Sequence, residues 1–202
     1  TMVDALRVHL HGAPGGRLAA RPLSLHLVGV NGVGKSLASE LLRAAMFRTA
    51  AQREAATLQL SMTAFQVDST TPAELVAATR ARLLLQVLHK LDAQPRALIL
   101  LDEVQYASKE VLKALNPVLD SEYVQYADTT RRVRVADAVI VFMSDIGSLE
   151  LHADVDRVEQ ERVLRDSARA LIDNERSFDL VKHVVPFFRP DRRAQLDLVG
   201  FA

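Results

Sequence analysis

The sequence predicts an α/β domain in which a parallel β-sheet lies between layers of helices. The first observation is the apolar run Leu23–Val28, which leads into the glycine-rich segment Gly29–Ser36 and then into the helix-forming run Leu37–Ala45. The second is the stretch Arg96–Gln105, in which two adjacent carboxylates follow a row of hydrophobic residues. The third is that strand and helix signals alternate along most of the chain, as they do in βαβ units.

The segment Gly29–Ser36 reads GVNGVGKS and matches the P-loop pattern of a glycine, four residues, and then Gly-Lys-Ser. Its glycines let successive backbone N–H groups turn toward phosphate oxygens, and the dipole of the following helix favours a bound anion. We expect Lys35 to reach the terminal phosphates of ATP and the Ser36 hydroxyl to ligate Mg²⁺. A chance glycine turn is the alternative, and the elements on both sides of the loop argue against it. The predicted nucleotide-binding residues are Gly29, Val30, Asn31, Gly32, Val33, Gly34, Lys35, Ser36 and Leu37.

The two carboxylates after the second apolar run predict hydrolysis in addition to binding. Neighbouring residues on a strand point to opposite sides, so we expect Asp102 and Glu103 to have different roles. Asp102 would hold the magnesium ion together with Ser36, and Glu103 would orient and partly deprotonate the attacking water. A well-placed base of this kind raises the rate by about 10²–10⁴. The alternative is an ordinary acidic turn after a strand, which the P-loop in the same chain makes less attractive.

The composition fits a compact enzyme domain. The chain has 202 residues, of which 49% are hydrophobic, enough for one substantial core. No apolar run approaches the roughly 20 residues that cross a bilayer. Lys and Arg number 25, as do Asp and Glu, and this balance argues against a dedicated nucleic-acid surface. The absence of cysteine excludes disulfides, thiolate catalysis and cysteine-ligated zinc, while the compartment stays open. Because Thr1 precedes Met2, we expect an excised piece of a longer protein, in which a missing targeting segment means little.

The remaining elements follow from local patterns. A capping box over Thr71–Glu74, with Pro72 at the first helical position, predicts the start of a long helix, and Gln94-Pro95 ends it. Ser108 is expected to cap a helix that kinks at Pro117. The other expected elements are strands at Thr57–Ser61, Ala138–Ser144 and Leu196–Phe201, a hairpin within Tyr123–Val135, and helices at about Lys35–Phe47 and Val155–Ile172.

Four further side chains are weaker candidates for functional groups: His9, His11, His26 and Phe65. His9 and His11 would chelate a metal from one face of a strand, but no carboxylates lie near them in the sequence, which favours a solvated amino-terminal segment. His26 is expected to be a core histidine. Phe65 precedes the loop in which unfoldases present an aromatic residue to their substrates, and packing at a strand end is the favoured interpretation.

The order of P-loop, acidic strand and a strand ending in Met143–Ser148 resembles the large ATPase domain of AAA+ proteins, and within them the Clp-type unfoldases and the torsins. Torsin-like segments are PLSLHLVG before the P-loop, LKALNPVLD at Leu112–Asp120, and Val184–Pro190. Clp-like segments are GVGKS and Phe188–Asp197. The resemblance implies a P-loop NTPase three-layer sandwich with a central five-stranded parallel sheet, one large domain over residues 1–202, and a lid domain after Ala202.

Two positions depart from the AAA+ pattern. The strand-end sensor is commonly asparagine in this family, and here it is Asp145. A carboxylate cannot donate a hydrogen bond unless it is protonated, so Asp145 either positions water or magnesium or leaves the site slow. The position of the Clp arginine finger holds Gln195, with Arg189, Arg192 and Arg193 nearby. These arginines read more readily as a solvated face.

The resemblance therefore implies an ATPase that remodels protein partners and takes its arginine finger from a partner, as torsins do. Its catalytic residues would be Glu103, Asp145 and Lys35, its ligands ATP and Mg²⁺, and its assembly a homo- or hetero-oligomer without nucleic acid or membrane span. Two alternatives stay open: an ATP-binding but inactive family member, and a P-loop small-molecule kinase. A torsin-like protein would reside in the endoplasmic reticulum lumen or nuclear envelope, and a Clp-like one in the cytoplasm.

Overall fold

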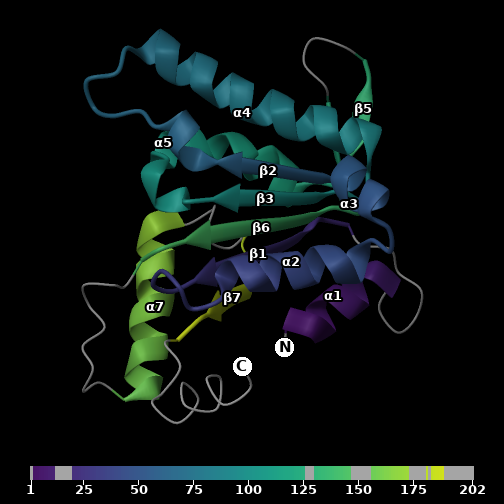
Figure 1. Ribbon diagram of the computed structural model, residues 1–202. Helices are drawn as coiled ribbons and strands as arrows, with labels where there is room; N and C mark the ends of the chain where they lie inside the picture. Colours follow the sequence, from purple (N-terminus) through teal and green to yellow (C-terminus); the bar gives the residue numbers. More distant parts are fainter. Residues whose placement is uncertain are drawn as a thin grey trace.

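The computed structural model describes residues 2–11, 20–125, 130–146, 156–172, 181 and 183–188. Its centre is a five-stranded sheet with the strand order β2-β3-β6-β1-β7, in which every pairing is parallel (Figure 1). This arrangement confirms the predicted α/β fold. The strands are β1 (Leu23–Val28), β2 (Thr57–Ser61), β3 (Leu98–Asp102), β6 (Val139–Ser144) and β7 (His183–Pro186).

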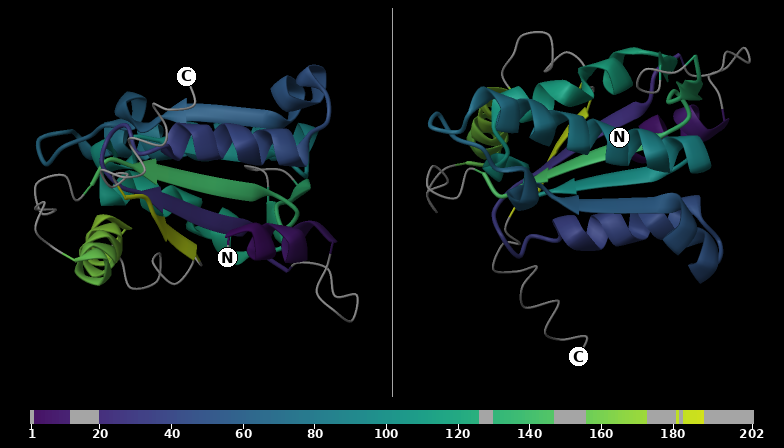
Figure 2. Two further views of the ribbon diagram at one scale, coloured as in Figure 1. Left: turned by 60° about the horizontal axis from the view of Figure 1, so that its bottom comes forward. Right: turned by 90° about the horizontal axis from the view of Figure 1, so that it is seen from above.

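Helices cover both faces of the sheet, as the views in Figure 1 and Figure 2 show. One face is covered by α1 (Met2–His11) and α2 (Lys35–Met46), and α3 (Ala50–Ala56) leads from α2 into β2. The opposite face is covered by α4 (Ala73–Ala93), by a run of short helices, and by α7 (Arg157–Ile172). The short helices are α5 (Lys109–Leu112), η3 (Lys113–Leu115) and α6 (Asn116–Asp120), and two single turns, η1 (Met62–Phe65) and η2 (Val104–Tyr106), follow β2 and β3.

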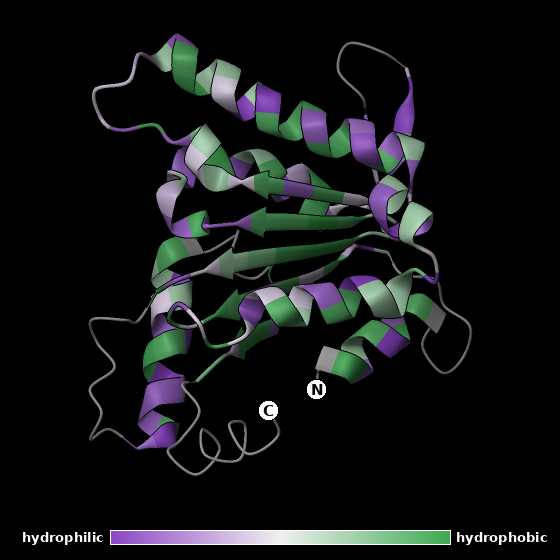
Figure 3. Cartoon of the chain, viewed as in Figure 1, coloured by the Kyte–Doolittle hydropathy of each residue, from purple (hydrophilic) through white to green (hydrophobic). Residues whose placement is uncertain are grey.

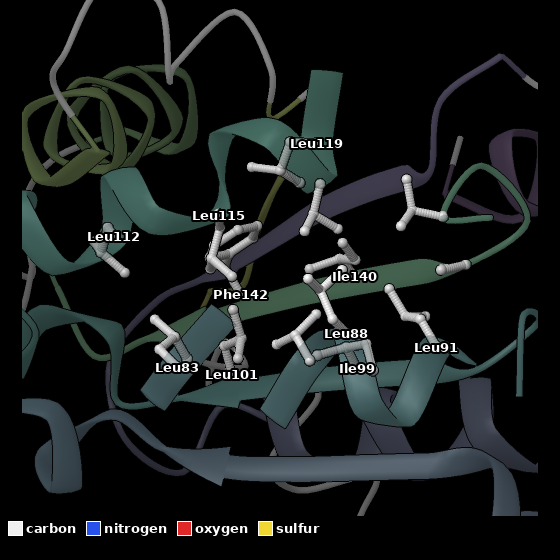
Figure 4. Packing of buried hydrophobic residues seen from close by; sticks show 14 of the residues in the cluster. Leu83, Leu88, Leu91, Ile99, Leu101, Leu112, Leu115, Leu119, Ile140 and Phe142 are labelled. Carbon is white, nitrogen blue, oxygen red and sulfur yellow. The ribbon is translucent and has the colours of Figure 1, made fainter. Parts of the chain in front are cut away.

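The central strands are buried on both faces, which is why their sequences are mostly apolar, with Ser24 and His26 as the buried polar residues inside β1. In β3, Ile99 and Leu101 pack toward α4, while Leu98 and Leu100 join the cluster beneath α1 and α2. The strands of the sheet are accordingly coloured mostly as hydrophobic in Figure 3. Figure 4 shows the larger cluster, in which β3 and β6 meet α4 and the short helices through the buried side chains Leu83, Leu88, Leu91, Ile99, Leu101, Leu112, Leu115, Leu119, Ile140 and Phe142. Each such side chain contributes about 1.5–3 kcal/mol on burial.

Several predicted elements are confirmed with small changes of boundary. The hairpin consists of β4 (Tyr123–Gln125) and β5 (Arg132–Arg134), paired antiparallel, and its tip lies outside the described residues. Ser108 caps α5, because its side chain accepts a hydrogen bond from the backbone N–H of Val111. The predicted kink at Pro117 takes the form of a broken helix, since α5, η3 and α6 follow one another and the proline stands at the start of α6. A proline is tolerated there because the first helical N–H groups have no intrahelical acceptor.

The predicted capping box at Thr71–Glu74 is wrong. Helix α4 begins at Ala73, Pro72 is its N-cap residue, and no side chain caps it. The Thr71 hydroxyl instead donates to the Asp68 carboxylate at 3.0 Å and accepts the Asp68 N–H at 3.0 Å. The reason is local competition, because a short acidic side chain three residues upstream offers the hydroxyl a partner within the turn.

The strand face that was the less favoured alternative for His9 and His11 does not form, because Met2–His11 is helix α1. The predicted strand Leu196–Phe201 lies outside the described residues, and the fifth strand of the sheet is β7. Within the described residues, no helix combines the length and apolar character that a bilayer crossing requires.

Candidate active site

A pocket of about 380 Å³ lies at the carboxyl ends of the central strands. The arrowheads of β1, β3 and β6 point to the same edge of the sheet, where the loop between β1 and α2 lies (Figure 1). The pocket is lined by Asn31, Gly32, Gly34, Lys35, Ser36, Asp102, Glu103, Met143 and Asp145. The predicted P-loop, the two strand-end carboxylates and Asp145 are therefore brought together. Four other predicted binding residues, Gly29, Val30, Val33 and Leu37, are not among the lining residues.

The loop conformation suits an anion. Gly32 and Gly34 have φ angles of 81° and 101°, which L-residues with a side chain rarely adopt. Gly34 is the N-cap residue of α2, where no side chain accepts a hydrogen bond and no acidic residue occupies the first turn. The N-terminus of α2 therefore keeps backbone donors and positive dipole potential for an anion such as phosphate.

Gly29 lies where two backbone segments come close together. A Cβ atom at this position would lie 2.4 Å from the backbone oxygen of Phe187, which is closer than real Cβ contacts come. The Phe187 N–H donates to the carbonyl of Val28 at 2.7 Å and brings the end of β7 against the start of the loop. Glycine is therefore required here by the close approach of two backbones.

Lys35 is 8% exposed and has an acceptor for each of its three ammonium hydrogens. It donates to the carbonyls of Gly29 and Val30, both at 2.8 Å. Its third partner is the Asp145 carboxylate, with Nζ and Oδ1 2.5 Å apart. The residue that follows the end of β6, Asp145, thus carries the counter-ion of the P-loop lysine.

Two contacts fix Asp145 in this place. Its backbone N–H donates to Gln105 Oε1 at 3.2 Å, which connects the end of β6 to the turn after β3. The preceding residue, Ser144, is hydrogen-bonded through Oγ to His26 Nε2 of β1 at 2.7 Å. His26 is fully buried, as predicted, and burial lowers its pKa to about 3, so the ring is neutral at physiological pH.

Asp102 lies in a pocket that has more carboxylates than positively charged side chains. The pocket holds the carboxylates of Asp102, Glu103 and Asp145 against one ammonium, that of Lys35. Burial raises the pKa of Asp102, and the charges of Glu103 and Asp145 raise it further, although the Glu103 N–H donated to it and the Lys35 charge act in the opposite direction. A divalent cation beside Asp102 would offset this excess of negative charge.

The donor set fits magnesium bound together with a nucleotide. Among the described residues, no group of three or more His, Cys, Asp or Glu side chains could hold a metal ion. Mg²⁺ is ordinarily bound by one or two protein oxygens together with substrate phosphates and water. Ser36 and Asp102, which line the same pocket, match that pattern.

Glu103 is held in a strained conformation just beyond β3. The strand ends at Asp102, and Glu103 has φ 57° and ψ 42°, the one positive φ of a non-glycine residue among those described. A left-handed residue with a side chain costs about 1–3 kcal/mol and occurs preferentially at functional sites. The carboxylate accepts a hydrogen bond from Ser61 Oγ at 2.9 Å, and that hydroxyl also lies 2.7 Å from Thr63 Oγ1.

The comparisons place the chain in a family. A family model described as "AAA domain (dynein-related subfamily)" matches residues 24–162, more than half of the chain, with the P-loop and acidic strand inside the match. The chain belongs to the AAA domain family. This subfamily is neither of the two groups that the sequence motifs resemble, so the torsin or Clp assignment stays a prediction.

The AAA domain is also similar to a solved structure, the Hsp104–ADP complex of S. cerevisiae, with a TM-score of 0.69 and 15% sequence identity. The similarity covers 99% of this chain and 34% of the other, so the AAA domain spans about a third of the length of that Hsp104 chain. At this identity the likeness establishes the fold. A search of curated protein sequences finds no match.

The predictions for Phe65 and for the arginine-finger region have different outcomes. Phe65 is 3% exposed, packs in the main core, and lies 4.6 Å beneath the Arg82 guanidinium, which confirms the packing interpretation. Gln195 and the arginines at 189, 192 and 193 lie outside the described residues.

Sequence reasoning missed Ser61 and Gln105. The register pairs Ser61 with Asp102. A polar residue at the end of the predicted strand Thr57–Ser61 was therefore a signal that Ser61 lies near the strand-end carboxylates. Gln105 carried no comparable signal.

Proposed function

We propose that this AAA domain is the nucleotide-binding part of a torsin- or Clp-like ATPase that binds Mg·ATP and couples its hydrolysis to the remodelling of a protein partner. The observation that carries the proposal is the convergence of Lys35, Ser36, Asp102 and Glu103 on one pocket at the carboxyl ends of β1 and β3. Strand-end pockets of this kind are where open α/β sheets bind their ligands.

Each residue has a role in the proposed reaction. The backbone of the loop and the N-terminus of α2 bind the phosphates, and Lys35 reaches the terminal ones as a point charge. Ser36 and Asp102 would hold Mg²⁺, which when bound supplies positive charge for the phosphate oxygens. Glu103 orients the attacking water and accepts its proton. Its strained backbone and its bond to Ser61 set the direction in which the carboxylate points.

The arginine that completes such sites is proposed to come from a partner. By resemblance, the family position for an arginine finger holds Gln195. A supplied arginine is worth about 10³–10⁵ in turnover in related P-loop enzymes. The chain alone is therefore expected to hydrolyse ATP slowly, and a binding protein that is inactive as an ATPase is the second candidate. The Lys35–Asp145 ion pair favours that candidate.

The test separates binding from chemistry. Calorimetric titration with Mg·ATP should show at least a tenfold weaker affinity, about 1.4 kcal/mol, for Lys35→Ala. Lys90→Ala is the matched control, since Lys90 also donates to a backbone carbonyl, that of Ala55, but outside the pocket. Equal affinities of wild type and Lys35→Ala would refute nucleotide binding at this loop.

Phosphate release then decides between the two candidates. Glu103→Gln should keep the ATP affinity and lower turnover about a hundredfold. Turnover of the wild type should rise at least tenfold when a partner protein supplies an arginine. Binding without measurable turnover, with every partner tried, would support the inactive binding protein instead.

A further inference from the structure

The ion pair between Lys35 and Asp145 occupies the Lys35 ammonium, the positively charged side chain of the pocket that a bound phosphate would contact. All three hydrogens of the Lys35 ammonium have acceptors, and an ammonium has no fourth donor. A phosphate oxygen that binds Lys35 must therefore replace one of these acceptors.

The acceptors differ in charge and in place. The carbonyls of Gly29 and Val30 are neutral and belong to the loop that surrounds the lysine. The Asp145 carboxylate is anionic, comes from the end of β6, and lies on the pocket wall with 24% of its side chain exposed. Asp145 is thus the acceptor that a phosphate would replace, because it is negatively charged, as a phosphate is, and faces the pocket that the phosphate would enter.

The backbone that carries the Asp145 carboxylate is held in place, so the carboxylate stays on this wall of the pocket. The hydrogen bond from the Asp145 N–H to Gln105 and the buried pair of Ser144 with His26 fix the backbone at this strand end. When a phosphate takes Lys35, the carboxylate remains beside it with its cation withdrawn. Like charges in a partly buried site repel strongly because water screens them little.

We propose that Asp145 is a specificity-determining residue that competes with the terminal phosphate for Lys35, so that the site holds a nucleoside diphosphate more tightly than a triphosphate. The inference rests on the proposed function, because it assumes that the pocket binds a nucleotide. A triphosphate has one more anionic group to place near the lysine than a diphosphate has, and P-loop lysines contact the two terminal groups. Either nucleotide must take Lys35 from Asp145, but the triphosphate also brings a further anionic group near the carboxylate whose cation has been withdrawn, so repulsion weakens its binding more.

Calorimetric titration of the full chain with Mg·ADP and with the β,γ-imido analogue of Mg·ATP tests this inference. The wild type should bind ADP at least tenfold more tightly than the analogue. Asp145→Asn keeps the size and an acceptor oxygen but removes the charge, so it should tighten the analogue at least tenfold and ADP less than threefold. Asp120→Asn is the matched control, since its carboxylate pairs with Arg21 at 3.0 Å, before β1 and away from the pocket.

The outcomes are distinguishable. Tightening of both nucleotides by one factor, or a weaker affinity for the analogue in Asp145→Asn, would overturn the inference while the proposed function stands. A failure of wild type, Asp145→Asn and Asp145→Thr to bind either nucleotide, in samples with cooperative thermal unfolding, would overturn both.

Discussion

The buried histidine behind the pocket predicts how the stability of the fold depends on pH. His26 lies in β1 with no exposed surface, and its ring bonds to Ser144 beside Asp145. Among the described residues its Nδ1 has no hydrogen-bond partner. Burial lowers the pKa of the ring to about 3 from the ordinary 6.5. The unfolded chain therefore binds a proton on this residue below pH 6.5, whereas the folded chain does not until about pH 3.

The sign and size follow from this difference. Because the unfolded state binds more protons between pH 6.5 and 3, the free energy of unfolding falls as pH decreases through that window. The slope approaches about 1.4 kcal/mol per pH unit, so His26 alone removes about 2.5 kcal/mol between pH 7 and pH 4.5. For a chain of this length that corresponds to a decrease in Tm of about 5–10 °C.

Urea unfolding at several pH values measures this contribution. His26→Gln can keep a donor for Ser144 and cannot titrate, so its stability should fall less between pH 7 and pH 4.5 than that of the wild type. His89→Gln is the matched control, because it makes the same exchange at an exposed position of α4. In the wild type, the NMR shifts of the His26 ring should stay those of a neutral imidazole at pH 5. A ring that titrates near pH 6.5, or identical pH dependence in wild type and His26→Gln, would refute the argument.

Two further substitutions test the pocket and its edge. Asp102→Asn should raise Tm of the nucleotide-free chain at pH 8, because a carboxylate whose pKa is raised in the folded state costs stability once pH exceeds that pKa. The same substitution should abolish the additional stabilisation that Mg²⁺ gives in the presence of ADP. An unchanged effect of Mg²⁺ in thermal scans would contradict the assignment of Asp102 as a magnesium ligand. Gly29→Ala should cost about 1–3 kcal/mol or more in urea unfolding, because its Cβ would meet the Phe187 backbone. Gly32→Ala, which faces open space, should cost only the ~1 kcal/mol of a left-handed residue, and equal losses would exclude the close-approach argument.

The sheet was predictable because its strands are buried on both sides. The runs at β3 and β6 are apolar up to their last residue, and β1 has only Ser24 and His26 among apolar residues; such runs are typical of strands buried on both faces of a parallel sheet. Helix α3 was missed although Thr49 and Gln52 form a capping box, a signal that the sequence carries. Strand β7 was missed because its residues are only partly buried and the edge of the sheet requires no apolar run.

The site was predictable as far as backbone pattern determines it. Gly-Lys-Ser after a strand and Asp-Glu after a strand place five residues at one edge whatever the side chains around them do. The conformation of Glu103 was not predictable, because the strand was expected to continue past it and the left-handed turn depends on tertiary contacts. The contact of Glu103 with Ser61 needed the register of β2 against β3, which hydrophobic periodicity does not supply.

The two departures from the AAA+ pattern act in the same direction. A carboxylate in place of an amide at Asp145 adds a negative charge beside the P-loop lysine, and glutamine at 195, by resemblance, removes a positive charge that would otherwise approach the phosphates. In the proposed site, either change alone would leave a polyphosphate with fewer cations to neutralise it, and the two effects would add if residue 195 holds the arginine-finger position that the resemblance implies. An arginine from a partner would compensate for both changes. Its guanidinium could pair with the Asp145 carboxylate and with a phosphate oxygen, which would leave Lys35 available to bind the nucleotide. The proposed need for a partner and the proposed preference for a diphosphate would thus have one physical cause, a shortage of positive charge around Lys35.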